Sequence, residues 1–273
     1  DMPFSIWISG TNGKTTTTQM IQHLLKDKGS LCGGNIGTPI CDLNEEAPIW
    51  IIETSSFTMH YIKEAKPNLY ILLPISEDHI SWHGSYEEYR KAKLKPLSLM
   101  KEGDIAIVPY EFKDIKSDAL IITYKDSSCL EKEFSINSKE VVFKEPFLLD
   151  ALLALACEKI LFDEVSYLQI NSYKVDEHKI EEFIDETNRL WIDDSKATNI
   201  DATLNALASY KEKRILLILG GDDKGSNLTP LFEYIKDFNI ELFNIGANTQ
   251  RLNEFSKNYN IEFNSCETLA TAV

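Results

Sequence analysis

The start of the chain runs from a strand-like segment through a glycine-containing loop into a helix, and this order strongly constrains the fold. The apolar run ends at Ile8, the loop contains Gly10 and Gly13, and Lys14 and Thr15 open the helix-patterned segment. Loop N–H groups, the positive end of the helix dipole and the lysine charge together favour a bound phosphate. The threonine hydroxyl can then bind a magnesium ion. The segment therefore indicates a site for a nucleotide phosphate.

The spacing differs from that of the usual P-loop. Ile8 stands where the first glycine is usually found, so the loop is the shorter GxxGKT form that begins at Gly10. A glycine turn beside a surface lysine is the alternative interpretation.

Composition excludes several classes of protein. A formal net charge of −15 argues against nucleic acid as a main partner, because a phosphate backbone needs clustered lysine and arginine. The longest apolar runs, such as Phe147 to Cys157, are too short to span a bilayer, and no secretory signal opens the chain. The five cysteines are scattered without a CxxC pair, which indicates reduced thiols rather than a zinc site or a disulfide framework. We expect a cytoplasmic monomer that binds neither nucleic acid nor a membrane.

Alternating β-type runs and helix-patterned segments predict an α/β fold whose first part is a P-loop-type parallel sheet flanked by helices. Strands are expected at Phe4–Ser9, Ile49–Glu53, Leu69–Pro74, Ile105–Pro109 and Leu120–Tyr124, and helices at Lys14–Lys28, Tyr86–Met100 and Phe147–Leu161. The charged, alternating piece from Ser127 to Lys144 is interpreted as an antiparallel β excursion.

The pattern restarts near residue 175, which predicts two domains, 1–175 and 176–273. Two β-type runs and a helix come first in the second domain, at Ile180–Ile184, Leu190–Ile192 and Asn199–Ser209. A Rossmann-like β/α series follows, with strands at Arg214–Leu219, Ile240–Asn244 and Ile261–Phe263 and helices at Leu228–Lys236 and Thr249–Phe255. Both ends look cut, so we expect this domain to be incomplete.

Carboxylate and histidine side chains follow two of the first domain's strands. Glu53 ends an apolar strand, and a carboxylate at the carboxyl end of a strand near the P-loop can hold a nucleotide-bound magnesium ion. The alternative is an edge acid followed by a helix cap at Thr54–Ser56. His79 follows the next strand and could bind a second metal ion, although His83 could be the functional residue, or both could be ordinary loop residues.

Three further segments carry charged side chains. Lys93 lies in a basic stretch that reads as a solvated helix face. In the second domain, loops at Asp193–Asn199 and Gly220–Gly225 each combine a lysine with carboxylates. Such loops suit an anionic, amine-bearing small molecule, but caps and turns would explain them equally well.

Six short motifs, spread over nearly the whole chain, together carry a family resemblance. They are GTNGKTT (Gly10–Thr16), GGNIGTP (Gly33–Pro39), ETSSF (Glu53–Phe57), EDHISWHGSYEEYRKAK (Glu77–Lys93), DDSKATN (Asp193–Asn199) and GGDDKG (Gly220–Gly225). In these segments the chain resembles the Mur ligases, the ATP-dependent amide-forming enzymes of peptidoglycan assembly. The last two resemble the branch that adds D-glutamate to UDP-N-acetylmuramoyl-L-alanine.

The resemblance implies roles for individual residues. ATP would be bound by Gly10, Thr11, Asn12, Gly13, Lys14, Thr15, Thr16, His178, Lys179 and Asp194. Two magnesium ions would be held by Thr15, Glu53, His79 and Lys93, the last after carbamylation of its amine. The UDP-linked substrate and the incoming amino acid would contact Asn35, Ser55, Lys196, Thr198 and Lys224. The catalytic residues would be Lys14, His79, Lys93 and Lys196.

One departure from the family pattern lies at the start of the second domain. The family reads His-Arg there, whereas this chain has His178 and Lys179, and lysine lacks the bidentate fork of arginine. The family also has an N-terminal uridine-binding domain and a longer C-terminal domain, so the resemblance implies a fragment that binds nucleotide without turnover. Another amide ligase on the same scaffold, such as a folylpolyglutamate synthetase or another Mur branch, and a nucleotide-dependent ATPase switch are the alternatives.

Overall fold

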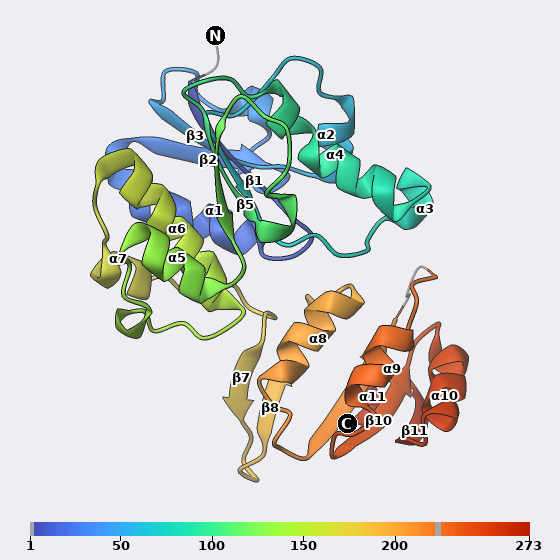
Figure 1. Ribbon diagram of the computed structural model, residues 1–273. Coiled ribbons are helices and arrows are strands. Elements are labelled where there is room, and N and C mark those ends of the chain that lie inside the picture. Colours follow the sequence, from blue (N-terminus) through green and yellow to red (C-terminus); the bar gives the residue numbers. More distant parts are fainter. Residues whose placement is uncertain (1–2, 222–224) are drawn as a thin grey trace. The chain divides into compact units, whose positions relative to one another are not determined.

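The computed structural model describes residues 3–221 and 225–273. The chain divides into two compact units, residues 1–175 and 176–273. The two units are described separately below, and Figure 1 labels their elements.

The first unit is built on a six-stranded sheet in the order β2-β3-β1-β4-β5-β6. All neighbouring strands are parallel. The strands are β1 (Phe4–Ser9), β2 (Ser30–Gly34), β3 (Ile49–Glu53), β4 (Leu69–Leu72), β5 (Ile105–Pro109) and β6 (Leu120–Tyr124). Because β1 lies between β3 and β4, the segments that follow these three strands meet at one edge of the sheet, where open α/β sheets bind ligands.

Helices cover both faces of this sheet, as Figure 1 shows. They are α1 (Lys14–Leu25), α2 (Ser56–Tyr61), α3 (Ile80–His83), α4 (Tyr86–Leu99), α5 (Ser127–Phe134), α6 (Phe147–Phe162) and α7 (Tyr167–Asn171). Alternation along β1 divides the core in two, because successive strand side chains point to opposite faces. Ile6 and Ile8 pack with α1, α5 and α6, whereas Trp7 packs with α2 and α4.

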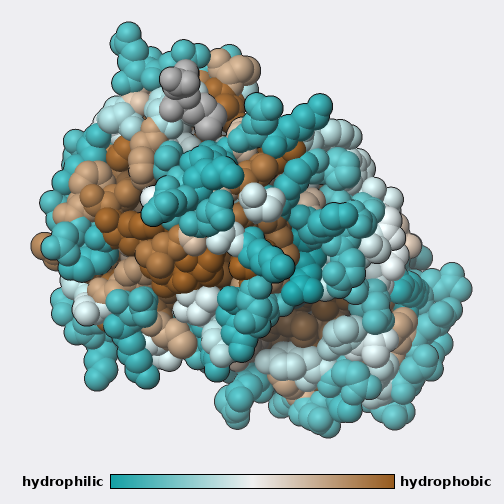
Figure 2. Space-filling model, turned by 45° about the horizontal axis from the view of Figure 1, so that its top comes forward, coloured by the Kyte–Doolittle hydropathy of each residue, from teal (hydrophilic) through white to brown (hydrophobic). Residues whose placement is uncertain are grey.

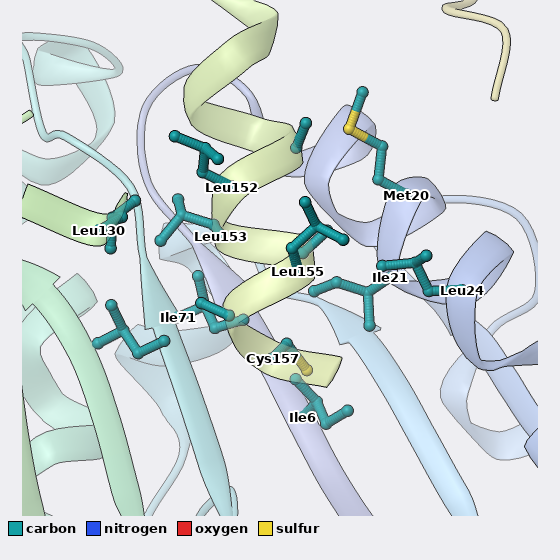
Figure 3. Close-up of a cluster of buried hydrophobic side chains, with 14 of the residues drawn as sticks. Ile6, Met20, Ile21, Leu24, Ile71, Leu130, Leu152, Leu153, Leu155 and Cys157 are labelled. Carbon is teal, nitrogen blue, oxygen red and sulfur yellow. The ribbon is translucent and has the colours of Figure 1, made fainter. Parts of the chain in front are cut away.

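Helix α6 is the centre of the larger core cluster. It is apolar on nearly every side, as expected for a helix packed between others. Figure 3 shows Leu152, Leu153 and Leu155 of α6 among side chains of α1, α5 and the sheet. Full burial of each such leucine stabilises the fold by about 1.5–3 kcal/mol.

The segment Ser127 to Lys144 is not the antiparallel β excursion that its alternation predicts. It contains helix α5 and a 3₁₀ turn at Ser138–Glu140. Asp126 caps α5 by accepting the N–H of Cys129 at 3.0 Å, and Leu130 and Phe134, four residues apart, are buried. A cap followed by apolar residues at helical spacing outweighs the local alternation.

The second unit contains a three-stranded parallel sheet in the order β11-β10-β9 and an antiparallel hairpin of β7 and β8. The strands are β7 (Glu181–Ile184), β8 (Leu190–Asp193), β9 (Ile215–Gly220), β10 (Ile240–Ile245) and β11 (Glu262–Glu267). The helices are α8 (Ile200–Ala208), α9 (Thr229–Ile235), α10 (Thr249–Asn258) and α11 (Leu269–Ala272). Phe232 of α9 and Leu242 of β10 are fully buried at its centre. The predicted α/β fold class, with two parallel sheets, is confirmed.

The surface is mixed in character. On the face seen in Figure 2, an area of apolar surface is bordered by polar side chains. Within residues 3–221 and 225–273, no helix has the length and hydropathy needed to cross a membrane.

Candidate functional site

The loop between β1 and α1 has the backbone expected of a phosphate loop. Gly10 and Gly13 have φ angles of 143° and 81°, and Gly13 is the N-cap of α1 without any side-chain cap. The Thr11 N–H donates to the Pro74 carbonyl at 3.0 Å, and the Thr11 hydroxyl donates to the Ser76 carbonyl at 3.1 Å. The loop is thereby tied to the segment that follows β4. Because its N-cap is a glycine, helix α1 begins without a side-chain cap, and such a helix start suits an anion.

Replacing Gly10 by alanine should destabilise the first unit by about 2–4 kcal/mol, because the new Cβ would clash with Leu73 Cβ and φ would stay in a region that L-residues avoid. Gly103 is the matched control: its φ is 93°, but a Cβ there meets nothing within 4 Å. Urea unfolding followed by the fluorescence of buried Trp7 and Trp50 measures both variants. Equal destabilisation by the two substitutions would show that the close approach to Leu73 is unimportant.

Glu53 lies at the centre of the candidate site. It ends β3 between β2 and β1, and it is only 2% exposed, so the edge-acid interpretation is wrong. Its Oε2 accepts a hydrogen bond of 2.8 Å from the Thr15 hydroxyl, and its Oε1 accepts one of 2.7 Å from the Asn35 amide. The expected helix cap after Glu53 is also present, because Ser55 Oγ accepts the N–H of Thr58.

A buried lysine, Lys93, and a half-buried one, Lys14, approach the loop backbone. Lys14 Nζ donates to the Thr11 carbonyl at 2.7 Å, and Lys93 Nζ donates to the Gly10 carbonyl at 2.6 Å. Burial lowers the pKa of Lys14, while the nearby carboxylates of Glu53 and Asp78 act in the opposite direction. Burial lowers the pKa of Lys93 further, to well below its ordinary value, and the charge of Lys14 adds to this effect.

The expectation of a solvated Lys93 is wrong, since the side chain is 1% exposed. Tyr89, Lys93 and Leu97 recur every fourth residue on the face of α4 that packs on the sheet, whereas Lys91 lies on the outer face. The spacing of four residues between Tyr89, Lys93 and Leu97 is the sequence signal that could have predicted the burial of Lys93. Sequence reasoning also missed Tyr89, whose hydroxyl lies 2.9 Å from the Thr11 hydroxyl and whose ring lies 4.9 Å from Lys93 Nζ.

His79 and His83 lie in a cluster of aromatic side chains beside α2. His79 has a left-handed φ of 52° at the start of α3, its Nε2 is 3.5 Å from Asp78 Oδ2, and its ring contacts Phe57. A His83 ring nitrogen is 3.0 Å from Ser56 Oγ. Burial and the neighbouring histidine charges lower the pKa of His83. A metal role for His79 therefore stays a prediction.

In the second unit, three of the predicted residues lie on adjoining segments. His178 Nδ1 is 2.7 Å from Asp193 Oδ2, and the His178 carbonyl accepts the N–H of Lys196 at 3.1 Å. Asp194 Oδ1 accepts the N–H of Ile180, and burial raises the pKa of Asp194 to about 6.

The other predicted residues of this unit are less constrained. Lys179 pairs with Asp176 at 2.9 Å, and Thr198 is exposed. Lys224 falls outside the described residues.

Fold and site together define a class: an α/β protein with a glycine-containing loop before a helix and a buried carboxylate at the carboxyl edge of a parallel sheet. Comparison with known proteins identifies the family. Residues 8–148 match the Mur ligase middle domain. The chain belongs to the Mur ligase family.

Its relatives include two curated ligases named UDP-N-acetylmuramoylalanine–D-glutamate ligase. The protein from Campylobacter jejuni is 52% identical over 272 residues, which cover 100% of this chain and 68% of that protein. The protein from Helicobacter pylori is 45% identical, and the match covers 99% of this chain and 68% of that protein.

Solved structures share the fold at low identity. MurF from Acinetobacter baumannii superimposes with a TM-score of 0.74 at 16% identity, covering 98% of this chain and 68% of that one. Folylpolyglutamate synthase from Mycobacterium tuberculosis, complexed with ADP and AMPPCP, superimposes with a TM-score of 0.66 at 11% identity. The match covers 100% of this chain and 83% of that one.

Proposed function

We propose that the protein is an ATP-dependent ligase of cytoplasmic peptidoglycan precursor synthesis that adds D-glutamate to UDP-N-acetylmuramoyl-L-alanine and forms ADP. The observation that carries the proposal is the convergence of Lys14, Thr15 and Glu53 on one loop in a chain whose curated relatives bear that name. The five free cysteines agree with a reducing compartment.

The chemistry joins a carboxylate to an amine. Transfer of a phosphoryl group from ATP to the substrate carboxylate gives an acyl phosphate, and the amine of D-glutamate displaces phosphate to form the amide. Both reactants of the first step are anions, so the protein must neutralise charge and hold the groups in line. Lys14 and the start of α1 supply positive charge at the phosphates.

The residues present fit a magnesium ion. Mg²⁺ prefers oxygen ligands at about 2.1 Å in octahedral geometry, so neighbouring ligands lie about 3.0 Å apart. Thr15 Oγ1 and Glu53 Oε2 are separated by 2.8 Å, which suits two ligands of one small ion. When bound, the ion would polarise phosphate oxygens as a Lewis acid. His79 is the proposed ligand of a second ion.

Lys93 is the proposed carbamylated residue. Its lowered pKa makes the neutral amine more available, and only the neutral amine can attack carbon dioxide. A new N–C bond forms, one proton leaves the nitrogen, and an anionic carbamate results. Beside Lys14, such a group would be a metal ligand in place of a buried ammonium.

Residues of the second unit are proposed to bind the remaining groups. His178 and Lys179 are assigned to the nucleotide phosphates, with Asp194 beside them. Lys196 and Thr198 are assigned to the carboxylates of D-glutamate, together with Lys224. Lys196 and Thr198 are exposed and so accessible to a small molecule.

The test is phosphate release by the full-length protein with ATP, magnesium and UDP-N-acetylmuramoyl-L-alanine. D-glutamate, L-glutamate, L-lysine and diaminopimelate are offered in turn. Release that depends on D-glutamate alone is the expected result. Release with a different amino acid would replace the proposed branch by another amide ligase, and release with no amino acid would indicate an ATPase switch.

A further inference from the structure

A buried carboxyl group of α6 lies directly behind the loop that joins β1 to α1. Asp150, in the first turn of α6, is 4% exposed, and the chemistry proposed above does not use it. Its Oδ1 accepts a hydrogen bond of 2.7 Å from the hydroxyl of Thr17 on α1. Burying a carboxyl group costs free energy unless polar partners compensate it. The pairing of Asp150 with α1 is such a compensation.

The same oxygen leaves no room for a side chain at residue 13. A Cβ on Gly13 would lie 2.6 Å from Asp150 Oδ1 and 3.3 Å from the methyl carbons of Leu73. The Gly13 carbonyl in turn accepts the N–H of Thr17 at 2.9 Å, the hydrogen bond that closes the first turn of α1. Asp150 therefore contacts this turn at its glycine and at its threonine.

A tyrosine of the sheet lies near the carboxyl group. The hydroxyl of Tyr124, at the end of β6, donates to the Leu72 carbonyl at the end of β4 with a distance of 2.9 Å. Burial raises the pKa of Tyr124, and the nearby charge of Asp150 raises it further. The first turn of α6 thus lies against α1 on one side and this end of the sheet on the other.

We propose that Asp150 is a positioning residue that holds the first turn of α1 in one place, so that the loop N–H groups and Lys14 keep a fixed orientation toward a nucleotide phosphate. The inference rests on the nucleotide binding proposed above. Donors that are fixed before the ligand arrives need no reorganisation when it binds, so affinity gains from the constraint.

Thr17 offers a test that leaves the carboxyl group in place. Thr17→Val in the full-length protein should weaken binding of ATP with magnesium about tenfold, the lower end for a lost hydrogen bond to a charged group. Thr17→Ser keeps the hydroxyl and should restore affinity. The turnover rate at saturating ATP should change by less than about twofold, because Thr17 is placed to act through α1 and not on the reacting atoms.

Thr18 is the matched control on the same helix. It is fully buried like Thr17, but within the described part of the chain its hydroxyl has no hydrogen-bond partner. Thr18→Val should therefore leave ATP affinity unchanged. Equal losses in the two valine variants would contradict a specific role for the Thr17–Asp150 contact.

Asp150 itself is tested against another buried aspartate. Asp150→Ala should weaken ATP binding at least as much as Thr17→Val, and the double variant should be no worse than Asp150→Ala alone, because the two side chains act as one unit. Asp104, 5% exposed and paired with Lys66 at 2.6 Å, is the control for loss of a buried carboxyl group. Asp104→Ala should lower stability without changing ATP affinity. Additive effects of the Thr17 and Asp150 substitutions would overturn the proposal.

Hydrogen exchange without nucleotide supplies a second readout. Amides of the first turns of α1 should exchange faster in Thr17→Val than in Thr18→Val. If the unmodified protein fails to bind ATP, the proposed function and this inference both fall. If it binds ATP and Thr17→Val binds equally well, only the inference falls. If Asp150→Ala weakens binding while Thr17→Val does not, Asp150 acts on the nucleotide directly and the positioning role is wrong.

Discussion

Replacing Lys14 by alanine in the full-length protein is expected to slow turnover at least ~100-fold, the low end for loss of one preorganised electrostatic contact. The half-buried Lys14 lies at the start of α1, and its ammonium group is held in place by a hydrogen bond of 2.7 Å to the loop carbonyl of Thr11. Initial rates of phosphate release at saturating substrates measure the effect.

Lys28 is a suitable control for that substitution. It lies just beyond α1 and forms a surface ion pair with Glu164 at 3.1 Å. Such pairs contribute about 0–1 kcal/mol, so Lys28→Ala should leave turnover unchanged. Near-normal turnover by Lys14→Ala would remove the basis for assigning the loop to nucleotide phosphate.

Lys93→Met is expected to abolish most activity, again by ~100-fold or more, while making the protein more stable. Methionine fills a similar volume, and it removes a buried ammonium whose burial opposes its charge. Burying a charge costs free energy, and replacing buried ion pairs by apolar residues of similar volume is often neutral or stabilises a protein by about 1–4 kcal/mol. Thermal unfolding in buffer free of carbon dioxide measures the stability, and phosphate release measures the activity.

The stability gain should depend on pH. Because the pKa of Lys93 in the folded protein is below the ordinary 10.5, the unfolded chain binds more protons between the two values. The stability of the unmodified protein therefore rises with pH across that window. The penalty is complete below the folded pKa of Lys93 and absent above 10.5, so the advantage of methionine should be largest below the folded pKa and shrink as the pH rises toward 10.5.

Lys91 supplies the comparison on the same helix. Its side chain is 76% exposed and pairs with Glu88 at 3.5 Å. Lys91→Met should change neither turnover nor the pH dependence of stability. A Lys93→Met variant that is less stable than the unmodified protein at neutral pH would show that its bond to the Gly10 carbonyl outweighs the cost of burying the charge.

The local sequence determined most of the helices and strands and the α/β fold class. The runs at β1, β3, β4, β5 and β6 are mostly apolar, as expected where helices cover the faces of a parallel sheet, and such runs are visible without a structure. Ser30–Gly34 was missed as strand β2, because two glycines and a short edge position leave little apolar signal. Ser127–Phe134 was misassigned because its cap and its two buried residues had to be weighed against a charged alternation.

At the candidate site, the sequence by itself determined which groups follow a strand. Gly10, Gly13, Lys14 and Thr15 form a loop and helix start whose phosphate-binding character depends only on neighbouring residues, and Glu53 ends a strand in any α/β arrangement. The tertiary structure alone decided which of these groups meet. Strand order brings Glu53 within 2.8 Å of Thr15, and the packing of α4 and α6 buries Lys93 and Asp150 behind the loop. These contacts join residues between 38 and 133 positions apart in the chain, and no local pattern encodes a separation of that length.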